Sequence, residues 1–424
     1  MDYFCTTQEK STTFMNTTKY ISLIFALLAT MLISCGEDRT GEYLEMTQEN
    51  QWIYSTMKDV YLWGEEIKQP EHSQFFSNTS KFFSSLLNKN DKVSYFTDTI
   101  KNESYGILAT FMRDPIAEQP SKVYALTLFV EPGSPADIAG VKRGTWISGV
   151  DGKELTISNT NILISGNAIK LTTEKIDYND EEMRYFWEQS DTLNMGNATE
   201  ITNHNILFDT IYSIRDKKAG YILCNSFNGE DFIEKTENIL LKFATEEVTD
   251  IVLDLRYNNG GSIANAATFA GALVPTTLHG TPFATLKKSE EIEDTIYNYM
   301  SSKANLCDKR ICIITGSRTC GVAELFINSL NSSRNMYDVL TFGINTKGDN
   351  VIVGTFNSPY GFAINPAIAF MHSASGSILS SEGVSADYPI NELEQIEHIQ
   401  PLGKEQEHLL YSTLHFIATD MIPQ

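Results

Sequence analysis

Two glycines and a thiol follow two strongly apolar segments, where a backbone turn could approach a substrate. The first segment ends in DLRYNNGG, and Gly260 and Gly261 would let backbone amides come close to a bound group. The second continues into GSRTCGVAELF, which places Cys320 just before a predicted helix. Backbone dipoles at a helix N-terminus stabilise a developing oxyanion, and a cysteine thiolate is a nucleophile. For the two glycines, a tight turn that only closes a strand is the alternative.

Alternating strands and helices are predicted from about residue 206 to the C-terminus. KKAGYILCNSF reads as a strand and FIEKTENILLKFA as a helix, and the two segments above each read as strand, turn and helix. This alternation predicts an α/β layer structure with parallel strands. Active sites of such sheets collect at the strand ends, where the glycines and the cysteine fall. Asp254 and Arg256 follow the first strand and would brace its turn.

A stretch of short strands and turns precedes this region. Its most regular part is VEPGSPADIAGVKRGTWISGVDG, residues 130–152. Ser134 can cap a short helix, Pro135 sits where a missing amide costs nothing, and Gly140 would end that helix. This run resembles the PDZ domain of bacterial envelope proteases, apart from Thr145, where an aspartate is usual.

The PDZ resemblance implies a site for peptide ends. PDZ domains add an extended peptide to a sheet edge, and backbone amides hold its terminal carboxylate. The candidate carboxylate-binding loop is the segment YGIL, formed by Tyr105, Gly106, Ile107 and Leu108. The segment lacks the fuller glycine pattern of such loops, so a plain first strand is the alternative.

Three motifs together point to one family. The PDZ-like run, GYILCNSF and DIVLDLRYNNGG resemble the carboxyl-terminal processing, or tail-specific, serine peptidases, whose pattern in the last motif is D-L-R-x-N-x-G-G. The resemblance spans nearly all of the chain beyond residue 40. It implies a crotonase/ClpP-like α/β core, an inserted PDZ domain and a small N-terminal helical region. It also implies an oxyanion hole built from the amide of Gly260 or Gly261 and that of Val322.

The Ser-Lys dyad of that family is not matched. Family members carry T-A-S-A-S-E or T-F-S-A-G-E at the nucleophile, whereas TCGVAE places Gly321 at the serine position. The family lysine lies in T-(aromatic)-G-K-x-V and acts as a base after burial lowers its pKa, whereas TKGDNV places Asp349 there. In subtilisin, loss of the nucleophile costs about 10⁶ in turnover. The sequence therefore predicts a catalytically impaired pseudopeptidase.

Other side chains could substitute for the missing nucleophile. Cys320 could attack with Lys347 as base if the turn shifted by one residue, although the shift would swing the thiol away from the oxyanion hole. Ser317 or the serines of SASGSILSSEG could be recruited, but serines next to glycines are usually turn residues. His372 is the histidine expected nearest the site, in a structural role. An active serine-type or cysteine-type peptidase and a non-enzymatic PDZ scaffold stay as the alternatives.

An apolar leader opens the chain. YISLIFALLATMLIS is about as long as a signal-peptide core and too short for a spanning helix, and a cysteine follows it. Leu32, Ile33, Ser34 and Cys35 resemble a bacterial lipobox, whose cysteine is lipidated and becomes the mature N-terminus. Met15 would begin a better-proportioned signal. We expect a lipid-anchored protein of the bacterial cell envelope, in the periplasm or at the outer membrane, with an ordinary secretory signal as the alternative.

Composition excludes several classes of protein. A chain of 424 residues with 42% hydrophobic residues is too long for one domain and can bury several cores. Its net charge of −22 disfavours nucleic acid and anionic lipid as main partners. Cys307 and Cys312 are close enough in sequence for a disulfide, although a buried free thiol is the commoner outcome for Cys312. No His/Cys cluster has zinc spacing, so neither a metal nor a cofactor is expected.

Four segments result from these observations. Residues 1–35 are the expected lipoprotein signal, 41–96 a helical region read from QWIYSTMKDVYLWGEEI and KFFSSLLNK, 97–205 the PDZ domain, and 206–424 the peptidase-like core. The expected function is the binding of peptides or unfolded protein C-termini. Contact with the membrane is expected through the lipid anchor only, and the oligomeric state is left open.

Overall fold

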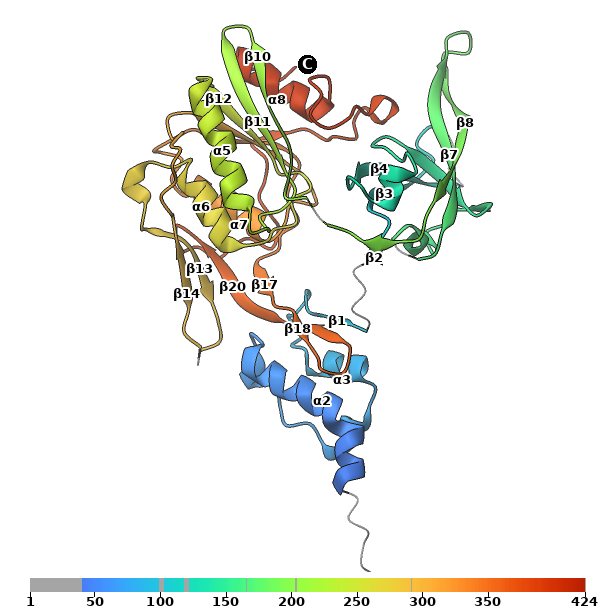
Figure 1. The fold of residues 1–424 in the computed structure, drawn as a ribbon, viewed down its shortest axis with the longest axis vertical. Coiled ribbons are helices and arrows are strands. Elements are labelled where there is room, and N and C mark those ends of the chain that lie inside the picture. Colours follow the sequence, from blue (N-terminus) through green and yellow to red (C-terminus); the bar gives the residue numbers. More distant parts are fainter. Residues whose placement is uncertain are drawn as a thin grey trace, which may run out of the picture.

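The computed structural model describes residues 40–98, 103–117, 122–164, 166–202, 204–290 and 292–423. These residues form an α/β core, a β-rich part beside it, and a helical N-terminal part at the lower end of the molecule in Figure 1. The predicted signal and Cys35 lie outside the described residues. Within the described ranges, no helix is both long and apolar enough to cross a membrane.

The core is built on a six-stranded sheet with the strand order β10-β11-β12-β15-β16-β21. Neighbouring strands run parallel except β10, which forms an antiparallel hairpin with β11. The parallel part confirms the predicted α/β arrangement. The strands are β10 (Ile206–Ile214), β11 (Lys217–Cys224), β12 (Asp250–Asp254), β15 (Arg310–Thr315), β16 (Val339–Gly343) and β21 (Tyr388–Pro389).

Helices cover both faces of this sheet. Ile251 and Leu253 of β12 pack into a cluster with apolar residues of α5, α6 and α7, whereas Val252 packs with α8 on the other face. Because both faces are buried, the central strands are apolar throughout rather than alternating with polar residues. The helices are α5 (Phe232–Thr245), α6 (Ile263–Gly271), α7 (Val322–Asn331) and α8 (His408–Thr419), with a short 3₁₀ turn at Thr276–Leu278 and another at Ile396–His398.

Two smaller antiparallel sheets connect the core to the N-terminal part. The first has the order β14-β13-β20-β17, and the second the order β1-β19-β18. Because β1 belongs to the N-terminal part and β19 to the core, the second sheet joins them. The strands are β13 (Pro282–Lys287), β14 (Thr295–Asn298), β17 (Val351–Val353) and β20 (Ala367–Ser373), then β1 (Tyr95–Thr97), β18 (Phe356–Asn357) and β19 (Ala363–Asn365).

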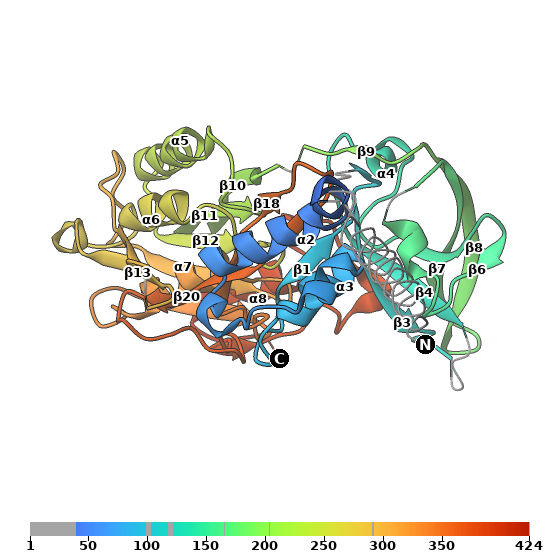
Figure 2. The ribbon, with the colours of Figure 1, turned by 90° about the horizontal axis from the view of Figure 1, so that it is seen from below.

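The N-terminal part contains the two helices expected from the sequence, α2 (Thr40–Val60) and α3 (Thr79–Leu86), with 3₁₀ turns at Gly64–Glu66 and His72–Phe76. Figure 2 shows both helices beside β1. Ile53 and Met57 of α2 are fully buried with two phenylalanines of α3, and the same cluster includes Ile364 of β19. The helical region is therefore packed onto the core through a shared cluster.

The β-rich part is an antiparallel sheet with the order β3-β4-β5-β7-β8, which leaves β3 at one edge. The predicted short helix is present as α4 (Pro135–Ile138), with Ser134 Oγ accepting from Asp137 N at 3.2 Å. Gly140 follows it with φ +86°, which confirms the expected helix end. The strands are β3 (Ile107–Arg113), β4 (Val123–Val130), β5 (Trp146–Val150), β6 (Lys153–Glu154), β7 (Ile169–Asn179) and β8 (Arg184–Met195); β2 (Glu103–Ser104) pairs with β9 (Thr199–Glu200), and a 3₁₀ turn spans Thr160–Leu163.

Candidate active site

The turn between β15 and α7 is the expected nucleophile turn. Gly321 directly precedes α7 with φ 59° and ψ −120°, a conformation that L side chains rarely adopt. A Cβ built on Gly321 would meet no described atom within 4 Å apart from its chain neighbours. The turn therefore keeps open space at the nucleophile position and has no side chain to fill it.

Glu324 holds this turn against the loop that carries the expected base position. Its buried carboxylate accepts from Gly321 N at 3.1 Å, from Asp349 N at 2.8 Å and from Gly348 N at 2.6 Å, and also from the Thr346 hydroxyl. Burial raises the pKa of Glu324, while these four donors act in the opposite direction. One carboxylate thus fixes the position of Asp349 relative to Gly321.

Asp349 forms an ion pair with the lysine that the sequence offered as a substitute base. Lys347 Nζ lies 3.0 Å from Asp349 Oδ2, and the lysine side chain is 57% exposed. Partial burial lowers the pKa of Lys347, but the hydrogen bond and charge of Asp349 prevail and the net shift is upward. A lysine base needs the opposite shift, because only the neutral amine accepts a proton.

Cys320 lies beside the same carboxylate. Burial, followed by the charge of Asp349, raises the pKa of the Cys320 thiol to about 11. Among the described hydrogen bonds, Lys347 Nζ donates to Asp349 and not to Cys320. The raised pKa leaves the thiol protonated near neutral pH, and the Lys347 amine beside it is engaged by Asp349, which argues against the Cys320–Lys347 substitute.

The three amides expected in the oxyanion hole differ in their engagement. Gly260 N donates to Asn258 Oδ1 at 2.9 Å, so this amide is already occupied. For the amides of Gly261 and Val322, no acceptor is found among the described residues. Gly260 has φ +98°, and a Cβ there would lie 3.1 Å from Val322 N. The glycine therefore lets the two turns meet closely, and Gly261 and Val322 offer the free donors.

A buried charge network braces the end of β12, as expected for Asp254 and Arg256. The fully buried Arg256 guanidinium contacts Asp254 Oδ2 at 2.8 Å and Glu407 Oε1 at 2.7 Å. Arg143, from the β-rich part, reaches the same network at Glu392 Oε2 (3.0 Å) and Glu407 Oε1 (3.3 Å). The network therefore joins the β-rich part to the core beside the candidate site.

Two cavities lie along β3, where the β-rich part faces the core. The larger, about 570 Å³, is lined by Cys320 and Lys347 together with Leu108 and Thr110 of β3. The smaller, about 380 Å³, is lined by the head of β3 and by residues of the core. Both cavities are lined by Leu108, Tyr257 and Asn259.

The free edge of β3 faces the core. Since β3 pairs only with β4 in its sheet, its other side carries unpaired backbone groups. On that side, Arg318 Nη2 donates to the Ala109 carbonyl at 2.8 Å. Arg318 lies three residues before Gly321, so the strand edge and the nucleophile turn border one cleft.

The expected carboxylate-binding loop is only partly available to a peptide. Tyr105 is fully buried, its amide donates to Ile164 O at 3.0 Å, and its hydroxyl donates to Asn167 O. Tyr105 therefore anchors the loop, which differs from its expected role as a peptide contact. Of the four loop residues, Gly106, Ile107 and Leu108 line the smaller cavity.

The remaining sequence candidates lie as follows. Ser317 lines the larger cavity, whereas His372 lies in β20 with Nδ1 2.8 Å from Gly376 O and does not line it. Cys307 and Cys312 are both free thiols in this structure, as are Cys224 and Cys320. In the part of the chain that is described, no group of three His, Cys, Asp or Glu side chains could hold a metal ion.

Comparison with known proteins identifies the family. Residues 218–390 match peptidase family S41, and residues 48–95 match the peptidase S41 N-terminal domain. The carboxy-terminal processing protease CtpA of Bacillus subtilis (strain 168) is 24% identical over 301 residues, which is 69% of this chain. The match spans 59% of the length of that relative. The chain belongs to peptidase family S41, the carboxyl-terminal processing peptidases.

Solved structures share the fold over most of the chain. A putative S41 protease from Bacteroides fragilis superimposes with a TM-score of 0.73 at 24% identity, covering 87% of this chain and 97% of that one. The photosystem II D1 C-terminal processing protease superimposes with a TM-score of 0.55 at 15% identity, covering 88% and 98%. The peptidase fold, including the small helical N-terminal part, is therefore preserved here.

Proposed function

We propose that this protein binds peptides or unfolded protein C-termini on a peptidase scaffold that no longer hydrolyses them efficiently. The observation that carries the proposal is Gly321. It occupies the nucleophile position before α7, with free donors at Gly261 and Val322 and no side chain in the open space. The ion pair of Asp349 with Lys347 supports the same proposal, because it replaces a neutral base with a charged pair.

The peptide would bind along β3. The PDZ-like sequence of residues 130–152 supports a role for residues 97–205 as a PDZ domain, which adds a peptide as an extra strand. The free edge of β3 and the two cavities beside it support this mode, because a strand added there would run from Gly106 toward Cys320. Such a strand would replace the contact between Arg318 and the Ala109 carbonyl.

We further propose that the protein is tethered to the bacterial cell envelope by lipid on Cys35. The lipobox-like LISC supports this localisation. Labelling of the expressed protein with a fatty-acid analogue tests it. Cys35→Ala is expected to abolish labelling, and equal labelling of the variant would exclude Cys35 as the attachment site.

Cleavage and binding assays on the same peptides test the proposed function. The unmodified protein is expected to bind a tail peptide that ends in a free carboxylate and to leave it intact. Steady turnover that Cys320→Ala abolishes would establish a relocated cysteine nucleophile instead. Equal affinity for amidated and free-carboxylate peptides would contradict capture of C-termini, and absence of binding would favour a scaffold with another partner.

Restoring the dyad gives a second test of the site. Gly321→Ser combined with Asp349→Lys is expected to produce measurable hydrolysis, because a Cβ at Gly321 has open space and Glu324 holds both positions together. The backbone conformation of Gly321, which L side chains rarely adopt, should cost about 1–3 kcal/mol in unfolding free energy. Gly321→Ala with Asp349→Lys is the matched control without a nucleophile. If the restored protein is folded but as inactive as the control, the site has lost more than its dyad.

A further inference from the structure

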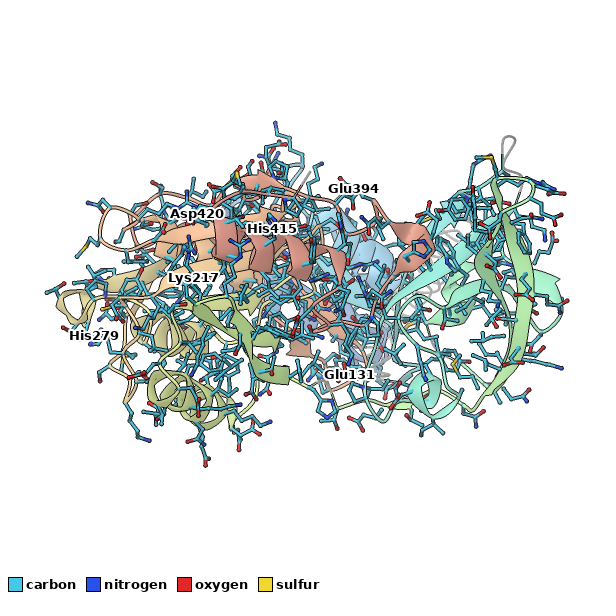
Figure 3. All side chains as sticks on the ribbon, turned by 90° about the horizontal axis from the view of Figure 1, so that it is seen from above. Glu131, Lys217, His279, Glu394, His415 and Asp420 are labelled. Carbon is cyan, nitrogen blue, oxygen red and sulfur yellow. The ribbon has the colours of Figure 1, made fainter. Side chains whose placement is uncertain are left out.

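Glu131 is a buried carboxylate at the boundary between the β-rich part and the core (Figure 3). It follows the last residue of β4, and its side chain is only 8% exposed. It lines the smaller cavity beside Gly106, Ile107 and Leu108, at the head of the free strand edge. A carboxylate therefore occupies the end of the cleft where a peptide added to β3 would begin.

Only half of this carboxylate is used. Oε1 accepts from both His204 N and His204 Nδ1, each at 2.7 Å. Within the described residues, no group donates to Oε2 and no Lys or Arg nitrogen lies within 4 Å of the Glu131 carboxylate. A bound peptide would displace the water that can reach Oε2, so this oxygen would then need a donor or cation from the peptide.

Apart from His204, the other polar groups of this cavity are uncharged and are compatible with the same kind of ligand. Asn225, Ser226, Asn228 and Asn259 line it. The cavity thus combines one carboxylate with four uncharged polar side chains. Ammonium and guanidinium groups carry several donors and no acceptor, so they satisfy such a set and neutralise the carboxylate.

We propose that the cavity of Glu131 receives the side chain of a lysine or arginine in the bound peptide, and that Glu131 determines this specificity. The inference rests on the proposed function and specifies that the bound peptides carry a basic residue near their ends. The net charge of −22 adds to it, because a strongly acidic protein attracts basic segments before contact. An apolar peptide side chain in this cavity would leave Glu131 Oε2 without a donor.

Peptide binding by fluorescence anisotropy tests this inference. A fluorescent tail peptide is prepared with lysine at each of its last six positions in turn, and each peptide is compared with the same peptide carrying norleucine there. At one or two adjacent positions, lysine is expected to tighten binding at least about tenfold, as a charge-assisted hydrogen bond does. Arginine at the same position should bind comparably, and glutamate should bind more weakly than norleucine.

Variants of the full chain assign the effect to Glu131. Glu131→Gln keeps an acceptor for His204 and should remove the preference for lysine over norleucine. Glu200→Gln is the matched control, because Glu200 is an exposed carboxylate near the cavity that does not line it. Its lysine preference should persist.

The outcomes separate this inference from the proposed function. Peptides that bind equally well with lysine and norleucine at every position would overturn the inference and leave peptide capture standing. A lysine preference that survives in Glu131→Gln would likewise overturn it, since general attraction to an acidic protein would then explain the preference. Absence of binding by every peptide would overturn both.

Discussion

At the scale of single residues, the candidate site is defined by the side chains around Gly321, the expected nucleophile position. Cys320 is the nearest reactive side chain, yet burial and the Asp349 carboxylate raise its thiol pKa to about 11. At pH 8, a thiol with that pKa has roughly a hundredfold less thiolate than an ordinary cysteine. A protonated and largely buried thiol packs within the turn and is a poor nucleophile.

Alkylation with iodoacetamide at pH 8 measures this directly. Cys320 is expected to react far more slowly than Cys307, which is half-buried in the same chain and serves as the internal control. Asp349→Asn removes the neighbouring negative charge, so it should lower the pKa of Cys320 and speed its reaction severalfold. Mass spectrometry of the two cysteine peptides gives both rates. Reaction of Cys320 at the rate of Cys307 or faster would contradict the raised pKa.

At the scale of elements, the loop before β3 depends on one close contact. Gly106 has φ +79°, and a Cβ there would lie 2.3 Å from the Ser134 Cβ, at the cap of α4. Gly133 has a similar φ of +75°, but a Cβ there meets open space among the described residues. Substitutions at these two glycines therefore distinguish two contributions to the unfolding free energy. One is the positive φ, and the other is the steric clash with Ser134.

Alanine at each position tests this difference. Gly133→Ala should lower the unfolding free energy by about 1–2 kcal/mol from its positive φ alone. Gly106→Ala should cost more and also weaken peptide binding, because the head of β3 must shift away from α4. Urea unfolding and peptide anisotropy report the two effects. Equal losses of unfolding free energy in the two variants would mean that a small shift relieves the contact with Ser134.

Glu407, the cap of α8, links this helix to the buried arginines. Burial alone would raise its pKa, but Arg256 and Arg143 lower it to about 2, below the ordinary value of 4.5. Ionised Glu407 therefore stabilises the fold fully above about pH 4.5, and this contribution is lost as the pH falls toward 2. About 2 kcal/mol should disappear between pH 5 and pH 3.

Urea unfolding at several pH values checks this contribution. Glu407→Gln should unfold more easily at pH 7 and show a flatter decline in stability between pH 5 and pH 3. Glu405→Gln changes an exposed neighbouring carboxylate, so its unfolding free energy should fall with pH as that of the unmodified chain does. Parallel declines for all three proteins would show that other carboxylates govern acid stability.

Local sequence signals predicted these elements better than they predicted the site. The cap of α4 was predictable because one segment contains its interacting residues, and in the turn after β12 the contact between Asp254 and Arg256 is equally local. Glu324 was not recognised as the residue that joins two loops, since its partners Thr346, Gly348 and Asp349 are distant in sequence. Its only local signal was its place three residues after Gly321, as in a helix capping box. Burial of Tyr105 likewise depends on a contact from the distant Asn167.

At the scale of the whole molecule, Arg143 fixes the β-rich part onto the core. Its guanidinium donates to Glu392 and Glu407 and to the Gln400 carbonyl, all on the core side of the boundary. Removing one member of a buried ion-pair network typically costs about 3–5 kcal/mol. Here much of that energy holds two parts of one chain in a single orientation.

Small-angle scattering can follow this orientation. Arg143→Met is expected to increase the radius of gyration, because the β-rich part loses its charged contacts with the core. Arg184→Met removes an exposed arginine from the same part and should leave the scattering unchanged. Superimposable curves for all three proteins would mean that apolar contacts alone hold the boundary.

The orientation of β3 also bears on solubility. An unpaired strand edge can recruit the same edge of another chain and start aggregation. Here the edge faces the core, and Arg318 already occupies one of its carbonyls. The strand that is available to a single extended peptide is thereby shielded from a second copy of the protein, because a folded neighbour is too bulky to enter the cleft. Loosening the boundary at Arg143 would expose the edge, so that variant should also aggregate more readily on storage.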